Sequence, residues 1–150
     1  MSSAPRPKMS RFVCEQLPEE LRYPFPNADG TARVDRLRSG DEYFAEDLEL
    51  VDGPLFPLGQ VVVTPGLLDE LAEVGIDPAA LGSLLERHRG GDWGELESED
   101  LVANDIAVRS GARILSSYRI GAVRIWVITE ASIDDAGDRA STCLLTPDEY

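Results

Sequence analysis

The sequence has one histidine and two cysteines, and this scarcity excludes the common metal sites built from imidazole and thiolate ligands. Such a site needs several of these ligands at close spacing, whereas Cys14, His88 and Cys143 are widely separated. A carboxylate site is not signalled either, because the segment SIDDAGDRAS lacks the ligand spacing of an EF-hand. We therefore expect no metal and no cofactor.

Long hydrophobic runs are also missing. The longest candidates, VVV and IWVI, are far shorter than the ~18 residues that cross a bilayer. The N-terminal MSSAPRPKMSRF has basic residues but no apolar segment behind them, so we expect no signal peptide and a cytoplasmic protein. The sequence contains no GxGxxG, P-loop or GxSxG motif, so it signals neither a phosphate-cradling loop nor a hydrolase nucleophile.

Negative charge, in contrast, is abundant, since 28 acidic and 14 basic side chains give a formal net charge of −14. A field of this sign repels phosphate backbones, which makes direct nucleic-acid binding unfavourable unless arginines gather in one place. The charge has two interpretations. It either keeps the protein soluble or presents a negative surface to a basic partner, such as one that normally holds nucleic acid.

The chain divides near residue 54. Residues 1–53 contain prolines at 18, 24 and 26, many acidic side chains and no sustained period. We interpret them as an extended, partly disordered acidic arm with local docking, or alternatively as a small β-rich arm lying over the second part. Pro54, Pro57 and Gly59 support a boundary before a compact domain of residues 54–150.

Start and stop signals predict three helices after a short VVV strand. The expected N-caps are Thr64, Asp77 and Ser98, and the expected terminating glycines are Gly75, Gly90 and Gly111. Proline follows the first two caps, as is typical of the first helical position. In the third helix, Leu101, Ile106 (or Val102) and Val108 are expected to face inward.

The hydrophobic period then changes from 3.6 to 2. ARILSSYRI and VRIWVITE alternate around a tight Gly121–Ala122 link, and RASTCLL forms a third strand after a loop. Cys143 lies in that last strand and is predicted to be a small buried hydrophobic residue. The sequence therefore predicts a two-layer α+β domain, with about three helices followed by an antiparallel three- to four-stranded meander.

The segment RHRGGDWG at residues 87–94 contains the only histidine. In a structural interpretation, protonated His88 is favoured by the helix dipole, the glycine pair makes a left-handed turn, and Trp93 packs between helix and sheet. Asp92 then pairs with an arginine or caps the turn. In a functional interpretation, His88 is a general acid/base on a surface loop and Asp92 orients it. Asn104 is unfavourable within a helix, which either a buried hydrogen bond or a site would explain.

Three arginines follow on the predicted sheet. Arg113 and Arg119 share a strand face, and Arg124 is expected to come level with them across the hairpin. They either pair with carboxylates on a solvated face or form a cationic patch that holds a phosphate beside His88. The hydroxyls considered for that site are Ser116, Tyr118 and Thr142. The candidate catalytic residues are thus His88, Arg113 and Arg124, and the candidate binding residues are Asp92, Trp93, Asn104 and Arg119.

Several motifs in residues 56–150 resemble those of a family of small bacterial proteins carried by plasmids and phages. They are GDWG, the following Asn-Asp, the Arg-Ile-Leu-Ser-x-Tyr strand, the Ile-Trp strand and the C-terminal Leu-Leu-x-Pro-x-Glu-Tyr. The matching residues are His88, Gly91, Asp92, Trp93, Asn104, Asp105, Arg113, Ile125, Trp126, Thr129, Glu130 and Tyr150. The sequence departs from the family where ASIDDAG precedes Asp138–Arg139. The resemblance implies a fold unit and a mobile-element origin, and it implies no activity.

These observations favour a small acidic, non-enzymatic accessory protein of mobile genetic elements that binds a protein partner with a basic surface, such as a nucleic-acid enzyme. One alternative is a ribonuclease-like toxin domain, by fold-level analogy, which requires His88, Arg113 and Arg124 in one concave patch. Another is a virion- or secretion-associated structural component whose residues 1–53 order on binding. The sequence leaves the oligomeric state open.

Overall fold

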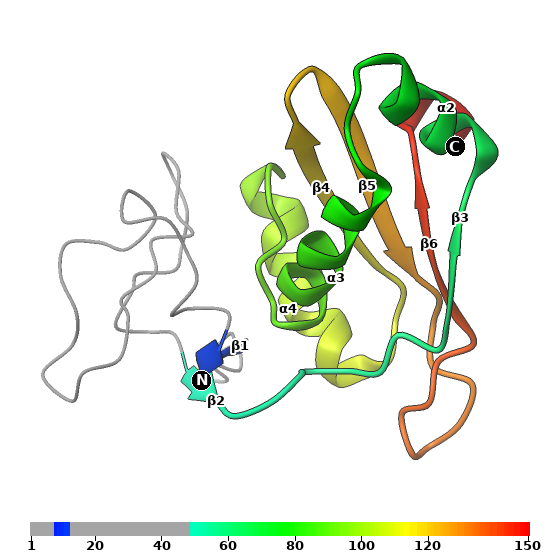
Figure 1. Ribbon diagram of the computed structural model, residues 1–150. Coiled ribbons are helices and arrows are strands. Elements are labelled where there is room, and N and C mark those ends of the chain that lie inside the picture. The colour runs from blue at the N-terminus through cyan, green and yellow to red at the C-terminus, as the bar shows by residue number, and fades with distance from the viewer. Residues whose placement is uncertain (1–7, 13–48) are drawn as a thin grey trace, which may run out of the picture.

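A computed structural model describes residues 8–12 and 49–150 of the chain (Figure 1). Predictions that fall on residues 1–7 and 13–48, including those for Cys14 and most of the acidic arm, lie outside the described residues. The elements are β1 (Lys8–Ser10), β2 (Glu49–Val51), β3 (Gln60–Val63), α2 (Pro65–Glu73), the 3₁₀ helix η3 (Pro78–Ala80), α3 (Leu81–Arg89), α4 (Ser98–Ser110), β4 (Ile114–Ile120), β5 (Val123–Thr129), β6 (Ser141–Leu145) and the 3₁₀ helix η4 (Pro147–Glu149).

The larger sheet has four strands in the order β3-β6-β5-β4. The pairs β4–β5 and β5–β6 are antiparallel, as predicted, but β3 pairs with β6 in parallel, with Val62 opposite Cys143. The fold is therefore α+β, as predicted, and β4, β5 and β6 form an antiparallel meander after the helices. The sheet as a whole is mixed, not purely antiparallel, because β3 adds to it in parallel. The VVV strand, β3, precedes the helices in sequence, yet in the sheet it lies beside β6, the last strand in sequence.

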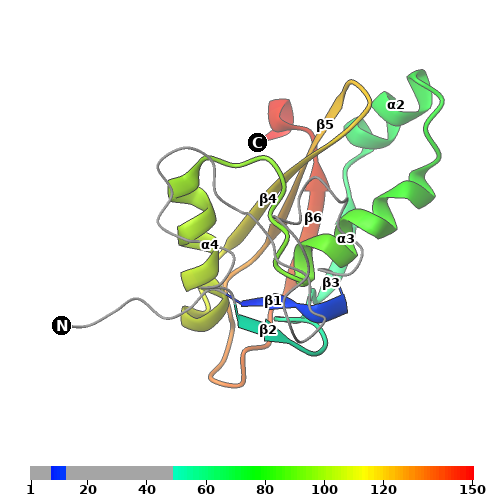
Figure 2. The ribbon, with the colours of Figure 1, turned by 90° about the vertical axis from the view of Figure 1, so that its left-hand side faces the viewer.

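Helices α2 and α3 cover one face of this sheet, and α4 flanks β4 (Figures 1 and 2). One hydrophobic cluster joins the two covering helices to the strands, and a second lies around α4 and the start of β4. The buried members of the first are Leu67, Leu71, Leu81, Leu84, Tyr118, Val123, Ile125, Val127 and Leu144. Those of the second are Phe56, Trp93, Leu101, Ala107 and Ile114. No helix in the described ranges is long and apolar enough to cross a membrane.

Local chemistry fixes the helix ends. The Thr64 hydroxyl accepts a hydrogen bond from the Leu67 amide at 3.2 Å, and Pro65 is the first residue of α2, as predicted. Asp77 caps η3, which continues into α3, by accepting from the Ala79 amide at 2.9 Å. Gly111 ends α4 with a left-handed φ of 82°.

Two predictions for α4 need correction. Glu97 is its N-cap and Ser98 its first helical residue, so the expected cap is one position late. Ile106 is 47% exposed, whereas Asn104 and Asp105 are buried. The inward face of α4 is partly polar because these two side chains satisfy backbone and indole groups of neighbouring segments, as described below.

The described residues of the N-terminal part lie against the end of α3. β1 pairs with β2 in parallel, and Met9 is 1% exposed. The Ser10 amide donates to the Gly90 carbonyl at 2.7 Å, and the Leu55 amide donates to the Arg89 carbonyl at 2.8 Å. The proposed boundary near residue 54 stays a prediction.

Candidate functional site

His88 lies inside the protein, on the buried face of α3. It follows Leu81 and Leu84 at helical spacing, so the three side chains point toward the sheet together. The histidine is 0% exposed. Its ring packs edge-on against Phe56 and Trp93, with centroid distances of 5.2 Å and 5.9 Å. Substrate therefore has no path to either ring nitrogen in this arrangement.

Both imidazole nitrogens have hydroxyl partners on the sheet. Nδ1 lies 2.6 Å from Ser116 Oγ on β4, and Nε2 lies 2.8 Å from Thr129 Oγ1 on β5. Thr129 Oγ1 in turn lies 2.7 Å from Thr142 Oγ1 on β6, whose hydroxyl donates to the Leu58 carbonyl at 2.7 Å. The chain of hydrogen bonds thus links α3 to three adjacent strands and to the segment before β3.

The end of this chain determines the direction of its bonds as far as Nε2 of the imidazole. Each hydroxyl has one hydrogen, and that of Thr142 is given to the carbonyl, so Thr142 must accept from Thr129. Thr129 has then used its own hydrogen and accepts from His88 Nε2–H. The chain therefore requires a hydrogen on Nε2, and in the neutral imidazole Nδ1 accepts from the Ser116 hydroxyl.

Burial lowers the pKa of His88 to about 3, and the nearby positive charge of Arg139 acts in the same direction. The imidazole is therefore neutral at pH 7, which together with the hydrogen on Nε2 assigns it as the Nε2–H tautomer. The expectation that His88 is protonated at the helix end is not met. The free energy needed to remove a charged imidazole from water exceeds the stabilisation that the helix dipole gives to it.

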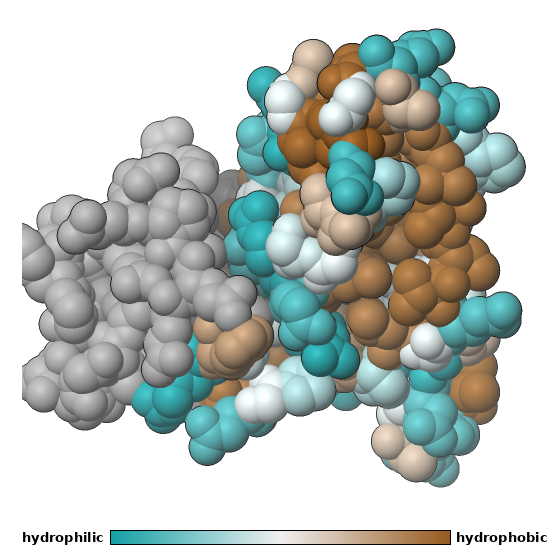
Figure 3. All heavy atoms as spheres, in the orientation of Figure 1, coloured by the Kyte–Doolittle hydropathy of each residue, from teal (hydrophilic) through white to brown (hydrophobic). Residues whose placement is uncertain are grey.

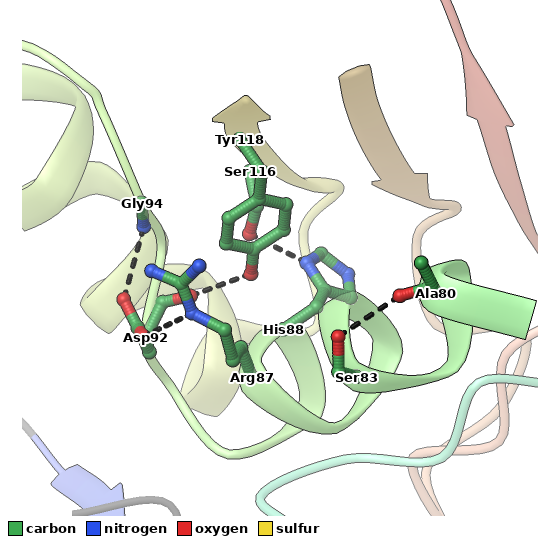
Figure 4. A network of polar contacts seen from close by, with 8 residues as sticks. All are labelled: Ala80, Ser83, Arg87, His88, Asp92, Gly94, Ser116 and Tyr118. Atoms are coloured by element: carbon green, nitrogen blue, oxygen red, sulfur yellow. Dashed lines mark hydrogen bonds and ion pairs between the residues drawn. The ribbon is translucent and has the colours of Figure 1, made fainter. Parts of the chain in front are cut away.

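The turn after α3 is held by Asp92 (Figure 4). Its Oδ2 pairs with Arg87 Nε at 2.6 Å, and its Oδ1 accepts from the Gly94 amide at 3.2 Å. Its backbone carbonyl accepts from the Tyr118 hydroxyl at 2.5 Å, and the Arg87 guanidinium lies 4.7 Å from the centre of that ring. The expected roles of Asp92, arginine pairing and turn capping, are both present, and Gly91 with φ 90° supplies the left-handed residue.

Trp93 and Asn104 close the outer edge of β4. The Trp93 indole donates to Asp105 Oδ1 at 2.9 Å. The Asn104 amide donates to the Leu115 carbonyl at 2.6 Å and accepts from the Leu115 amide at 3.3 Å, as a neighbouring strand would. Further along the edge, the Ser117 amide donates to the Trp93 carbonyl, and the Ser117 carbonyl accepts from the Glu95 amide. Asn104 itself is buried and makes two partly buried hydrogen bonds, which account for its unfavourable position in a helix.

The three sheet arginines do not form one patch with His88. Arg119 and Arg124 are directly opposite in the β4–β5 register, and both guanidinium groups lie 3.5 Å from Glu95. Arg113 precedes β4, six residues from Arg119, which corresponds to about 20 Å along a strand. Its guanidinium lies 5.7 Å from the centre of the Tyr150 ring. Arg124 also donates to the Ser117 hydroxyl at 2.9 Å.

Arg139 is a structural residue that the sequence analysis missed. It is 5% exposed, and its guanidinium donates to the carbonyls of Ala107, Ala112 and Glu130 at 2.8–3.2 Å. The carboxyl end of a helix carries partial negative charge that favours a nearby cation, so the end of α4 was a general signal for such a residue. Arg139 thereby fastens the loop between β5 and β6 to α4.

Within residues 8–12 and 49–150, no three histidine, cysteine, aspartate or glutamate side chains gather as metal ligands. An open groove of about 680 Å³ runs beside the start of β3 and is lined by Pro54, Leu55, Phe56, Pro57, Leu58, Gly59, Val61 and Arg89. Comparison of the chain with protein-family models, curated proteins and solved structures found no match. The geometry around His88 is that of a buried structural network.

Proposed function

We propose that this chain is a small, non-enzymatic accessory protein of a plasmid or phage, acting in the bacterial cytoplasm. It binds a protein partner with a basic surface, such as a nucleic-acid-processing enzyme. The observation that carries the proposal is the imbalance of exposed charge in residues 54–150. Fourteen acidic side chains are exposed there against three arginines, so the exposed charge favours a cationic partner.

The exposed acidic residues are Asp69, Glu70, Glu73, Asp77, Glu95, Glu97, Glu99, Asp100, Glu130, Asp134, Asp135, Asp138, Asp148 and Glu149, and the exposed arginines are Arg109, Arg113 and Arg119. Several arginines are already engaged within the protein: Arg87 with Asp92, Arg89 with Glu86, and Arg139 with three carbonyls. Little positive charge is therefore left to hold phosphate, which favours a protein partner over a nucleic acid.

The ribonuclease-like alternative has no supporting observation. Its general acid/base, His88, is buried and neutral, and Arg113 and Arg124 stand at opposite ends of the β4–β5 hairpin. A growth assay on expression remains informative, but His88→Ala alone is a poor test because it removes a buried structural side chain. Ser116→Ala breaks the same network and leaves the imidazole in place, and circular dichroism of both purified variants separates a lost fold from a lost catalytic group.

The binding proposal is tested with the full chain immobilised and exposed to the soluble proteins of a bacterial host, followed by titration with the purified retained protein. Two matched variants each remove three negative charges from one helix. The first is Glu97→Gln/Glu99→Gln/Asp100→Asn at the start of α4, and the second is Asp69→Asn/Glu70→Gln/Glu73→Gln on α2.

A specific basic partner should be weakened by added salt and affected about tenfold or more by one variant and much less by the other. Equal effects of the two variants would indicate non-specific attraction and would contradict the proposal. Catalytic turnover by the purified chain would also contradict the proposal, if replacing one exposed side chain abolished that turnover while the variant stayed folded.

A further inference from the structure

The two edges of the four-stranded sheet are treated differently. The β4 edge is covered by Asn104 and by the Trp93–Glu95 segment, whereas β3 is the last strand on the other side. We propose that the edge of β3 pairs with β3 of a second copy of this chain, in antiparallel orientation. This inference concerns a surface separate from the acidic one and does not depend on the proposed function.

The backbone of β3 offers hydrogen-bonding groups toward the open side. The Gln60 amide donates to the Ala140 carbonyl at 3.1 Å, and the Thr64 amide donates to the Leu144 carbonyl at 3.0 Å. Hydrogen-bonding groups alternate between the two sides of a strand, so those of Val61 and Val63 point away from β6. No other strand of the described residues lies on that side.

The side chains of this edge are apolar and exposed. Val61 is 41% exposed and Val62 is 40% exposed, and the hydrophobic surface visible in Figure 3 extends along the side where β3 lies. Natural edge strands are protected by a very short length, by a lysine or a proline, or by a bulge. β3 is short, with four residues, but QVVV contains neither lysine nor proline and pairs with β6 without a bulge. Apart from its length, the edge has none of these protections, which favours strand pairing.

The pattern of free groups is complementary to itself. A two-fold axis through Val62 places Val61 opposite Val63 of the partner subunit, and Val63 opposite Val61 of the partner subunit. Each of these two pairs exchanges both of its N–H···O bonds, which gives four hydrogen bonds across the axis. Val62 then faces the same residue of the second copy, and the two mixed sheets join into one continuous sheet.

Charge decides between a second copy and a basic partner at this edge. The stretch from Gly53 to Leu68 contains no charged residue, in a chain in which 28% of residues are charged. Electrostatic repulsion between two acidic copies is therefore weakest at this stretch. A basic partner, in contrast, has no carboxylate on β3 to bind. The two interactions consequently respond to salt in opposite directions, since salt screens repulsion between copies and attraction to a basic protein.

The test uses sedimentation velocity on the full chain over a range of concentration and salt. Val62→Glu and Val62→Lys each place two like charges against one another across the two-fold axis, and mixing the two variants places opposite charges there. Ile106→Lys on α4 is the matched control, because it alters a residue of similar exposure (47%) beside the opposite edge of the sheet. Thermal unfolding followed by circular dichroism verifies that each variant is folded.

We expect a wild-type dimer that strengthens with salt, a dissociation constant raised about tenfold or more in each Val62 variant, and recovery of the dimer in the mixture. The Ile106→Lys variant should dimerise like the wild type. A wild-type monomer at all concentrations overturns the proposal, even if another protein's strand occupies the edge. Dimers that tolerate both Val62 variants, or folded variants that fail to dimerise when mixed, overturn it as well.

Discussion

Lowering the pH from 7 to 5 is expected to destabilise the protein through His88, the only histidine in the chain. In the unfolded chain this imidazole has an ordinary pKa near 6.5, whereas burial lowers its pKa to about 3 in the folded protein. Between these two values only the unfolded state binds the proton. The contribution of His88 is therefore fully present above pH 6.5 and is lost as the pH falls toward 3.

The size of the effect follows from proton linkage. Each pH unit within this window changes the free energy of unfolding by about 1.4 kcal/mol when one proton is bound on unfolding. Half of the first unit lies above the unfolded pKa, so the expected loss between pH 7 and pH 5 is about 2 kcal/mol. A loss of this size is a large part of the stability of an ordinary small domain.

The assay is urea unfolding at a series of pH values, followed by tryptophan fluorescence. His88→Gln is the control, because glutamine does not titrate and retains a donor and an acceptor for Ser116 and Thr129. Carboxylates contribute equally to both proteins, so the difference between the two pH profiles isolates the histidine. A wild-type profile parallel to that of His88→Gln, or an imidazole NMR resonance that titrates near pH 6.5, would refute the argument.

Three further substitutions test the packing around this network by thermal or urea unfolding. Asn104→Ala leaves a partly buried amide and carbonyl of Leu115 unpaired and should cost about 1–3 kcal/mol; an unchanged midpoint would mean that water replaces the side chain. Arg139→Lys cannot reach three carbonyls at once and should cost about 2 kcal/mol or more. Gly94→Ala should cost at least about 2 kcal/mol, because φ is 75° and the added carbon collides with the Ser117 carbonyl. Its control, Gly82→Ala in open space on α3, should stabilise by about 0.5–1 kcal/mol, and equal effects of the two would contradict the packing argument.

Features set by neighbouring residues were accessible from the sequence. Thr64 with Pro65 and Asp77 with Pro78 each begin a helical segment because a short polar side chain can reach amides two or three residues ahead. The strands Ile114–Ile120, Val123–Thr129 and Ser141–Leu145 were found from their alternation, since one face of each is buried. These signals depend on only a few consecutive residues.

Features set by distant residues were not accessible. The β-branched run VVV predicts a strand but does not tell which other strand it pairs with, so the parallel pairing with β6 could not be predicted. Ile106 was expected inside α4 because apolar side chains usually occupy the inward face. The inward face of α4 lies beside the edge of β4, whose backbone groups need hydrogen-bond partners, and Asn104 provides them. A polar residue on an inward face becomes understandable only when its partner is known.

His88 shows the same limit at the candidate site. Its place after Leu81 and Leu84 at helical spacing indicated the buried side of α3, but the flanking arginines favoured an interpretation as an exposed basic helix end. The deciding partners are the hydroxyls of Ser116 and Thr129, which lie on strands made later in the chain. Only the folded sheet brings these hydroxyls to the imidazole and makes its burial tolerable.

The parallel pairing of β3 with β6 also sets an order of events during synthesis. The two strands are separated by about 80 residues, so β3 leaves the ribosome long before the strand that will hold it. The helices and the β4–β5 hairpin depend on contacts between nearby residues, so we expect them to form before β6 is available. Throughout that interval both sides of the VVV segment are unpaired, which makes the nascent chain, rather than the finished protein, the form most in need of a chaperone.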